Sequence, residues 1–144
     1  MALMTPDQIE AVVRRNVGVP TQPHFEVLAV GTESADIRLP YNDGMTRLGD
    51  TISGPVLMTA ADAAMYAAII AHVPDGEYAV TSHFHIDFLR RPRAADVLAR
   101  AHILRAGRRS VTCRVELFSQ DFDTLVAHVS GAYARMTTAT SGVG

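Results

Sequence analysis

The fold of this chain is decided by one stretch of its sequence, Gly54-Pro-Val-Leu-Met-Thr-Ala-Ala-Asp-Ala-Ala-Met-Tyr-Ala-Ala-Ile-Ile-Ala-His-Val73. Its alanines, methionines and leucine are strong helix formers, so the stretch predicts one long α-helix. Ser53 suits the N-cap position, and Pro55 lies in the first turn, where a missing N–H is harmless. Apolar or small residues occupy the whole circumference, which predicts a helix that the rest of the domain wraps on all sides.

A single carboxylate, Asp62, lies in the middle of this helix. Every other residue from Val56 to Ala71 is apolar, small or tyrosine. A carboxylate is rarely placed in apolar surroundings without a partner or a chemical function. Two interpretations therefore remain open. Asp62 is a functional group, or it is a structural acid that bonds a backbone group or the side chain of Thr81.

The composition indicates a single domain, residues 1–144, with a sizeable core. The net charge of -2 argues against nucleic-acid or anionic-membrane binding through bulk electrostatics. The apolar helix approaches the ~20 residues that span a bilayer, but its central Asp62 and the absence of a flanking Lys or Arg bias argue against a membrane segment. The single Cys113 precludes an internal disulfide, and the first seven residues do not resemble a signal peptide. We therefore expect a cytoplasmic protein.

Turn signals and hydrophobic periodicity divide the rest of the chain into further elements. Thr5-Pro6-Asp7-Gln8 has a capping-box pattern, so residues 1–19 are expected to hold a short N-terminal helix. The tail, residues 137–144, is small and polar and is expected to be frayed. Strands are expected at residues 24–31, 35–39, 78–89, 97–106, 111–117 and 125–136.

The order of these elements predicts the architecture. A short helix, two strands and the long apolar helix precede what reads as an antiparallel meander. A flat pair of strands cannot cover a helix that is apolar on all sides, whereas a sheet curled around it can, if something else covers the remaining face. We therefore predict an α+β domain with the hot-dog fold, in which a curved antiparallel β-sheet wraps a long central helix.

Three features resemble the PaaI-like branch of the hot-dog acyl-CoA thioesterases, over about residues 25–136. That branch starts its long helix with His-Gly-Gly, four residues, Leu, one residue and then Asp or Glu; residues 53–64 here read Ser-Gly-Pro-Val-Leu-Met-Thr-Ala-Ala-Asp-Ala-Ala. A strand similar to Asn-Ile-Asn-Phe-Leu-Arg-Pro follows, here His-Ile-Asp-Phe-Leu-Arg-Arg-Pro at residues 85–92. The third feature is the turn Gly107-Arg108-Arg109.

The chain departs from the pattern of that branch at four positions. Ser53 stands where the branch has His, and Pro55 stands where it has the second Gly. His85 and Asp87 occupy the two Asn positions of the strand. These departures concern the site rather than the fold.

The resemblance implies hydrolysis of an acyl-CoA thioester. It makes Gly54 the residue whose backbone N–H polarises the carbonyl, which suits a helix N-terminus, and Asp62 the general base or nucleophile. The two residues are eight positions apart, about 12 Å along a helix. One chain therefore cannot bring both to the same carbonyl, whereas two antiparallel helices around a two-fold axis can. We expect a dimer, or a pair of dimers, with shared sites.

Further residues are assigned to the site by the same resemblance or by position. Thr81 aligns with a Ser or Thr that lies near the catalytic acid and would orient the attacking water. Arginines at strand ends suit the phosphates of coenzyme A, which enters only as part of the substrate. No separate cofactor is expected. The substrate-binding candidates are Arg47, Ser53, Met58, Tyr66, His83, Arg90, Arg91, Arg108 and Arg109.

Some of these residues have a second interpretation. Ser53 is at least as well explained as an N-cap alone. His83, His85 and Asp87 continue one strand face at a spacing compatible with a metal, but no further ligand at typical spacing is evident, so no metal site is expected.

Two other functions compete with hydrolysis. The first is a hot-dog dehydratase or hydratase acting on acyl-CoA, which usually brings a His next to the helix carboxylate; no His lies next to Asp62 on its helix. The second is a non-catalytic acyl-CoA binding or sensor protein, which the replacement of the family His by Ser53 favours. Ligand binding without hydrolysis would identify it.

Overall fold

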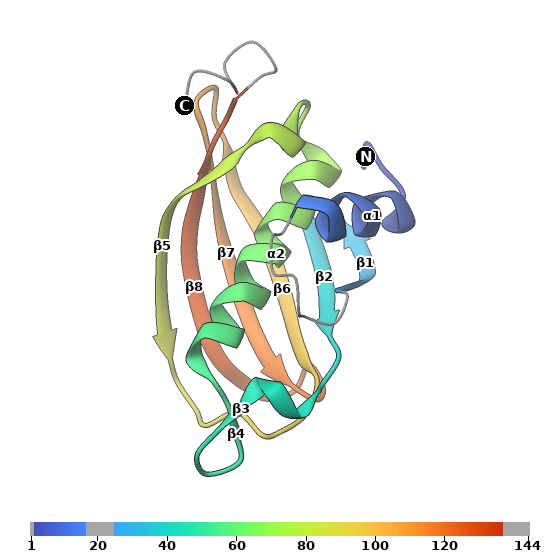
Figure 1. Ribbon diagram of the computed structural model, residues 1–144. Helices are drawn as coiled ribbons and strands as arrows, with labels where there is room; N and C mark the ends of the chain where they lie inside the picture. Colours follow the sequence, from blue (N-terminus) through green and yellow to red (C-terminus); the bar gives the residue numbers. More distant parts are fainter. Residues whose placement is uncertain (1, 17–24, 137–144) are drawn as a thin grey trace.

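The computed structural model describes residues 2–16 and 25–136. Its six long strands form one antiparallel sheet that curves around a long helix, α2 (Figure 1). The elements are α1 (Pro6–Asn16), β1 (Glu26–Gly31), β2 (Ser34–Leu39), the short 3₁₀-helix η1 (Asp43–Met45), β3 (Thr46–Arg47), β4 (Thr51–Ile52), α2 (Gly54–His72), the 3₁₀-helix η2 (Gly76–Tyr78), β5 (Val80–Phe88), β6 (Val97–Ala106), β7 (Ser110–Ser119) and β8 (Leu125–Ala134). The predicted hot-dog fold, with its short N-terminal helix, is confirmed.

The order of the strands differs from the predicted meander. The sheet runs β1-β2-β6-β7-β8-β5, so β5 pairs with β8, and β6 pairs with β2 on one side and β7 on the other. Residues 89–96 carry the chain from β5 across to β6. The prediction missed this because the order of strands depends on long-range pairing that the alternation along each strand does not encode. As a result, β5 lies at an edge of the sheet.

The predicted bounds of the other elements hold within a few residues. Ser53 caps α2 by accepting a hydrogen bond from the backbone N–H of Val56 at 3.4 Å. Thr5 and Gln8 form the predicted capping box at the start of α1. The loop before α2 holds the small hairpin β3–β4. Three of the predictions fall on residues that lie outside the described ones: residues 17–19, residue 24 and the tail 137–144.

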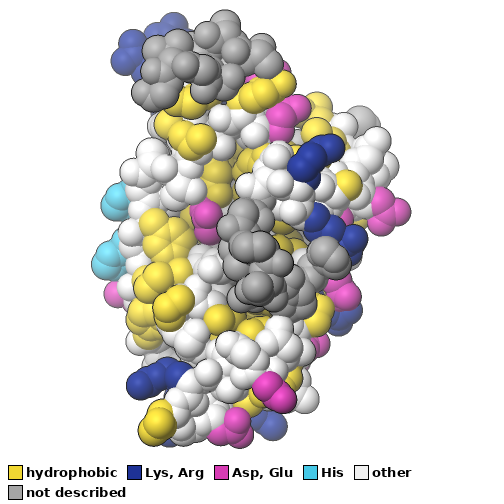
Figure 2. Space-filling model, viewed as in Figure 1, with side chains coloured by type: hydrophobic (Ala, Val, Ile, Leu, Met, Phe, Trp, Pro, Cys, Tyr) yellow, Lys and Arg dark blue, Asp and Glu magenta, His cyan; other side chains and the backbone are white. Residues whose placement is uncertain are grey.

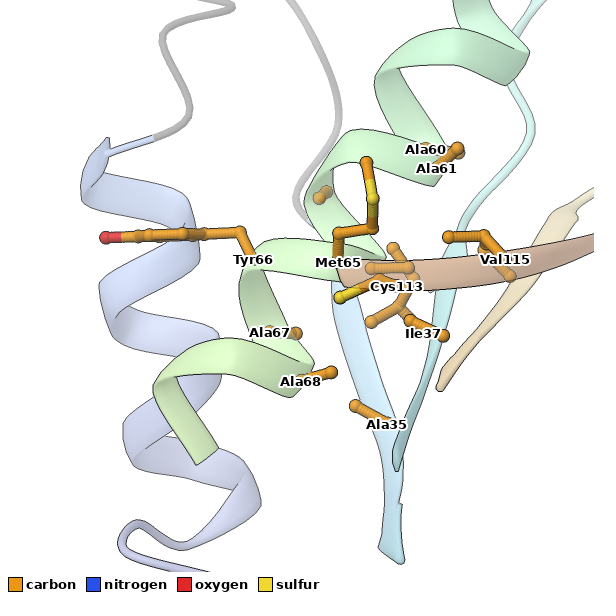
Figure 3. Packing of buried hydrophobic residues seen from close by; sticks show 14 of the residues in the cluster. Ala35, Ile37, Ala60, Ala61, Met65, Tyr66, Ala67, Ala68, Cys113 and Val115 are labelled. Carbon is orange, nitrogen blue, oxygen red and sulfur yellow. The ribbon is translucent and has the colours of Figure 1, made fainter. Parts of the chain in front are cut away.

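The core lies between α2 and the concave face of the sheet. Alanines on α2 pack toward the sheet, and Met65 lies with Ile37, Cys113 and Val115, as Figure 3 shows. Met65 also comes close to Gly131 of β8, where a Cβ would lie within 2.7 Å of Met65 Sδ. Small residues on both sides therefore let the helix and the sheet come close together.

The rest of α2 is covered only in part. Ile9 and Val13 of α1 are fully buried, and α1 packs against the C-terminal half of α2. The N-terminal half keeps one stripe that is exposed or half-buried, at Pro55, Met58, Thr59 and Asp62. The stripe recurs every three or four residues, so it lies on one face of the helix.

By length and composition alone, α2 could cross a membrane. It has 19 residues, and an 18-residue window within it has a mean hydropathy of 1.4. However, 72% of this window is buried inside the fold. The apolar character of α2 is thus explained by the core that it forms.

Candidate active site

The carboxylate of Asp62 is held by two hydroxyl groups. Thr81 Oγ1 on β5 donates to Asp62 Oδ1 at 2.8 Å, and the Tyr133 hydroxyl on β8 donates to the same oxygen at 2.6 Å. The Tyr133 hydroxyl also lies 3.1 Å from the backbone oxygen of Asp62. A half-buried carboxylate in an apolar helix is thereby provided with partners from two strands.

Tyr133 is itself buried, with 3% of its surface exposed. Its ring stacks on Tyr66 of α2, with the centroids 6.1 Å apart and the planes 19° from parallel. Burial, and then the neighbouring Asp62 carboxylate, raise the pKa of Tyr133 above the ordinary value of a tyrosine. The phenol therefore keeps its proton and acts as a hydrogen-bond donor.

A second polar group fixes Tyr66. The Asn16 amide Nδ2 of α1 donates to the Tyr66 hydroxyl at 3.0 Å, and this hydroxyl donates to the backbone oxygen of Glu77 at 2.9 Å. Burial is the main cause that raises the pKa of Tyr66, which leaves this phenol protonated as well. Figure 3 shows the Tyr66 side chain pointing away from Met65 and Cys113.

These side chains line a cavity of about 690 Å³. Its walls come from α1, α2, η2, β5 and β8, and they combine an aromatic and aliphatic surface with the Asp62 carboxylate. A largely apolar cavity with a few convergent polar groups is typical of a small-molecule site. The lining residues are Asn16, Met58, Thr59, Asp62, Tyr66, Glu77, Tyr78, Ala79, Val80, Thr81, Phe84 and Tyr133.

A β-bulge in β5 aims Thr81 into this cavity. Thr81 pairs with Tyr133 and His83 pairs with Ala132, so one extra residue lies between the two pairs. Strict alternation would place Thr81 and His83 on the same face of the strand. The bulge breaks the alternation, as bulges near functional sites do. Thr81 and Phe84 both line the cavity, and His83 does not.

A second hollow, of about 440 Å³, lies at the start of α2. Gly54 lies here in the first turn of the helix, where the N–H groups have no intrahelical partner. Among the described residues, the Gly54 N–H makes no hydrogen bond. Three guanidinium side chains surround the same groove, from the β3–β4 hairpin and from the segment after β5: Arg47, Arg90 and Arg91. None of them pairs with a carboxylate within residues 2–16 and 25–136.

The thioesterase superfamily model matches residues 49–127, more than half of the chain. This segment contains the helix with Asp62, the Gly54 groove except for Arg47, and the strands β5 to β7. The chain belongs to the thioesterase superfamily. The predicted enzyme class, a thioester hydrolase, is therefore confirmed.

Solved structures agree with this assignment. A Silicibacter sp. protein assigned as a thioesterase superposes with a TM-score of 0.80 and 28% identity, over 93% of each chain. A variant of the phenylacetic acid degradation protein PaaI of Thermus thermophilus is 29% identical, with a TM-score of 0.68, over 78% of this chain and 93% of that one. PaaI of E. coli has the same fold, with a TM-score of 0.71 and 22% identity, over 90% of this chain and 91% of that one. The resemblance to the PaaI-like branch is confirmed. The sequence matches none of the curated proteins.

The remaining predicted site residues of this thioesterase are dispersed. Ser53 caps α2 and lines neither hollow. Arg108 and Arg109 lie in the β6–β7 turn. The backbone oxygen of Arg109 accepts a hydrogen bond from the backbone N–H of Arg135. The Arg135 side chain in turn reaches Pro74, so this turn lies beside the C-terminal end of α2, far from Gly54. His83 is exposed on β5.

The neighbours of His83 form a pair of their own. His85 Nε2 lies 3.2 Å from Asp87 Oδ2, and both side chains are exposed. Within the described part of the chain, no three His, Cys, Asp or Glu side chains come together in a group that could hold a metal ion.

Sequence reasoning missed the residues that come to the thioesterase site from distant segments. Tyr133 is the most important, because it contacts Asp62 from 71 positions away. Asn16 was also missed. A weak signal existed for Tyr133: it follows Val129 and Gly131 at a period of two, which places it on the inward face of its strand.

Proposed function

We propose that this thioesterase hydrolyses the thioester of a short- or medium-chain or aryl acyl-CoA at a site shared between two subunits. The observation that carries the proposal is the Asp62 carboxylate, held by Thr81 and Tyr133 at the wall of a largely apolar cavity. The acyl group would occupy this cavity, between Met58, Tyr66 and neighbouring aromatic side chains. The polarising N–H would come from Gly54 of the other subunit.

Two chemical routes are open to Asp62. As a general base it would take a proton from water while the water oxygen attacks the thioester carbon. As a nucleophile it would attack that carbon itself, and water would then hydrolyse the resulting anhydride. In both routes the C–S bond breaks, the thiolate of coenzyme A takes up a proton, and a carboxylic acid is released. The Gly54 N–H would bind the oxyanion that forms in between.

Self-association is supported by the edge of the sheet. β5 is a nine-residue edge strand whose outer side has no partner strand in the described chain. A long unprotected edge is a site for pairing with another chain. Apolar side chains also gather along the β5 side of the molecule, as Figure 2 shows; among the exposed ones are Met58, Val80, Phe88 and Leu89. Pairing of two copies along β5 would cover these residues.

The division of the site supports the same arrangement. Gly54 and Asp62 line different hollows of one chain. A partner helix lying antiparallel along the stripe of α2 at Pro55, Met58, Thr59 and Asp62 would bring each groove to the other chain's cavity. The basic groove would then receive the phosphates of coenzyme A while the acyl group enters the cavity.

Mixed dimers test this proposal directly. Asp62→Asn and Gly54→Pro each remove one half of the site, so each homodimer is expected to lose at least about 99% of the wild-type activity. In a mixed dimer one of the two sites keeps both Asp62 and the Gly54 N–H. A refolded 1:1 mixture should therefore recover about a quarter of the wild-type activity, because about half of the dimers are mixed and each has one intact site. Release of free coenzyme A from acetyl-, hexanoyl-, palmitoyl- and phenylacetyl-CoA is the readout.

The result also separates the competing interpretations. No recovery of activity, although mixed dimers are detected by native mass spectrometry, would show that the site is not shared. A monomer that is fully active would contradict the dimer. If none of the thioesters is hydrolysed but they raise the melting temperature, acyl-CoA binding without turnover explains the site better.

A further inference from the structure

We propose that Tyr133 is a positioning residue that holds one oxygen of the Asp62 carboxylate, Oδ1, so that the other oxygen, Oδ2, performs the chemistry. The inference rests on the proposed function in that Asp62 is the reactive group. The inference goes beyond that function by naming the carboxylate oxygen that reacts and the residue, from a distant strand, that orients the carboxylate.

The first argument is that the two carboxylate oxygens of Asp62 differ in their hydrogen-bond partners. Oδ1 accepts from the hydroxyls of both Thr81 and Tyr133, at 2.8 and 2.6 Å. A carboxylate oxygen offers about two lone-pair sites, so these two donors occupy Oδ1. Among the described residues, no group donates to Oδ2. Oδ2 is thus the oxygen that keeps its lone pairs for water or for the thioester carbon.

The second argument is that Tyr133 is fixed before any substrate binds. Its ring stacks on Tyr66, whose own hydroxyl is tied to Asn16 and Glu77. Its hydroxyl also lies within hydrogen-bond distance of the Asp62 backbone oxygen, so it is anchored to the same helix turn as the carboxylate that it orients. A donor held by several contacts orients its partner at little entropic cost.

The third argument concerns how the strand reaches the helix. Gly131 lies two residues before Tyr133 on the inward face of β8, and it allows close contact with Met65 of α2. On the same face of β8, the Tyr133 hydroxyl lies within hydrogen-bond distance of Oδ1 and of the backbone oxygen of Asp62. Burial keeps the Tyr133 phenol protonated, so it remains a hydrogen-bond donor to the carboxylate of Asp62.

Tyr133→Phe tests the inference, since it keeps the ring that stacks on Tyr66 and removes only the hydroxyl. The carboxylate loses one of the two donors to Oδ1, so its two oxygens are no longer held in one orientation. The kcat should therefore fall about tenfold or more, with a smaller change in KM. Hexanoyl-CoA and phenylacetyl-CoA are the substrates to use.

The matched control is Tyr41→Phe. The Tyr41 hydroxyl also donates to a carboxylate, Asp43 Oδ1 at 3.2 Å, but outside both hollows. Its removal should leave kcat and KM unchanged. Thr81→Val removes the other donor to Oδ1 and should also lower kcat more than it changes KM. If Tyr133→Phe leaves kcat unchanged while Thr81→Val lowers it, the inference is wrong.

A measurement without turnover separates this inference from the proposed function. The Asp62 carboxyl carbon can be observed by ¹³C NMR at one fixed pH, with Asp62→Asn used to assign the signal. Its chemical shift should change in Tyr133→Phe, because a hydrogen bond to Oδ1 is lost, and stay unchanged in Tyr41→Phe, even if none of the thioesters is hydrolysed. An unchanged chemical shift in Tyr133→Phe would overturn the inference whatever the activity, whereas a changed one in a protein without activity would overturn only the proposed function.

Discussion

The two hollows along α2 differ in how their polar groups are partnered. In the Asp62 cavity, hydroxyl groups from β5 and β8 already hold the carboxylate, and Asn16 already bonds Tyr66. In the Gly54 groove, a backbone N–H and three guanidinium groups have no carboxylate or carbonyl acceptor among the described residues. The cavity is therefore organised in advance, whereas the donors of the groove remain available for an anionic ligand.

This difference indicates that the two hollows have different roles. A carboxylate that must react benefits from a fixed orientation, because reorganisation during the reaction would raise the barrier. Donors that bind phosphates or an oxyanion gain most if nothing else in the protein occupies them. The cavity thus suits the chemical step, and the groove suits charge recognition. The following changes test this comparison, from the largest expected effect to the smallest.

Asp62→Asn should have the largest effect. It keeps the size of the side chain and removes the charge, so kcat should fall about 10³-fold, within the range for loss of an acid–base group. Release of free coenzyme A under saturating acyl-CoA is the measurement. Asp123→Asn, in an exposed turn, is the control. Wild-type kcat in Asp62→Asn would show that Asp62 is a structural acid.

The Gly54 N–H can be removed without breaking the helix. Proline is tolerated in the first turn, so Gly54→Pro removes the donor while α2 still forms. It should lower kcat about 10²-fold, as expected for loss of one oxyanion donor. Gly54→Ala adds a Cβ, 3.3 Å from Phe88 Cζ, and keeps the N–H. Equal losses in the two variants would mean that crowding at Phe88, and not the missing N–H, lowers the activity.

The arginines should affect KM more than kcat. If the groove binds coenzyme A phosphates, Arg90→Ala should raise KM for phenylacetyl-CoA about three- to tenfold, and added salt should reduce the difference. Phenylacetyl-pantetheine lacks these phosphates and should show no such change. Arg114→Ala, on the exposed face of β7, is the control. A larger KM effect from Arg108→Ala or Arg109→Ala would place the phosphates at the β6–β7 turn.

Ser53 should give the smallest effect. Its side chain caps α2, so Ser53→Ala should lower the free energy of unfolding by about 1 kcal/mol and leave kcat nearly unchanged. Urea denaturation measures the first quantity. Ser53→Asn keeps an N-cap and should restore the stability. A loss of kcat in both variants, with normal stability in Ser53→Asn, would place Ser53 in the site instead.

Much of the fold was predictable because its signals are local. The composition and caps of α2 fixed its bounds, and alternation along β7 identified a half-buried strand. The predicted meander holds for β6, β7 and β8 but was wrong for β5, because its position beside β8 depends on contacts between residues far apart in the chain. The cytoplasmic location stays a prediction.

The sequence by itself determined that a long apolar helix carries one carboxylate at its middle and a free N–H at its start. These properties follow from helix propensity, capping and spacing, which act over a few residues. Only the tertiary structure decided what Asp62 contacts. The bulge that turns Thr81 inward and the reach of Tyr133 across 71 positions depend on strand pairing and on helix–sheet packing. Such pairing depends on the whole chain, so no local sequence pattern predicts it.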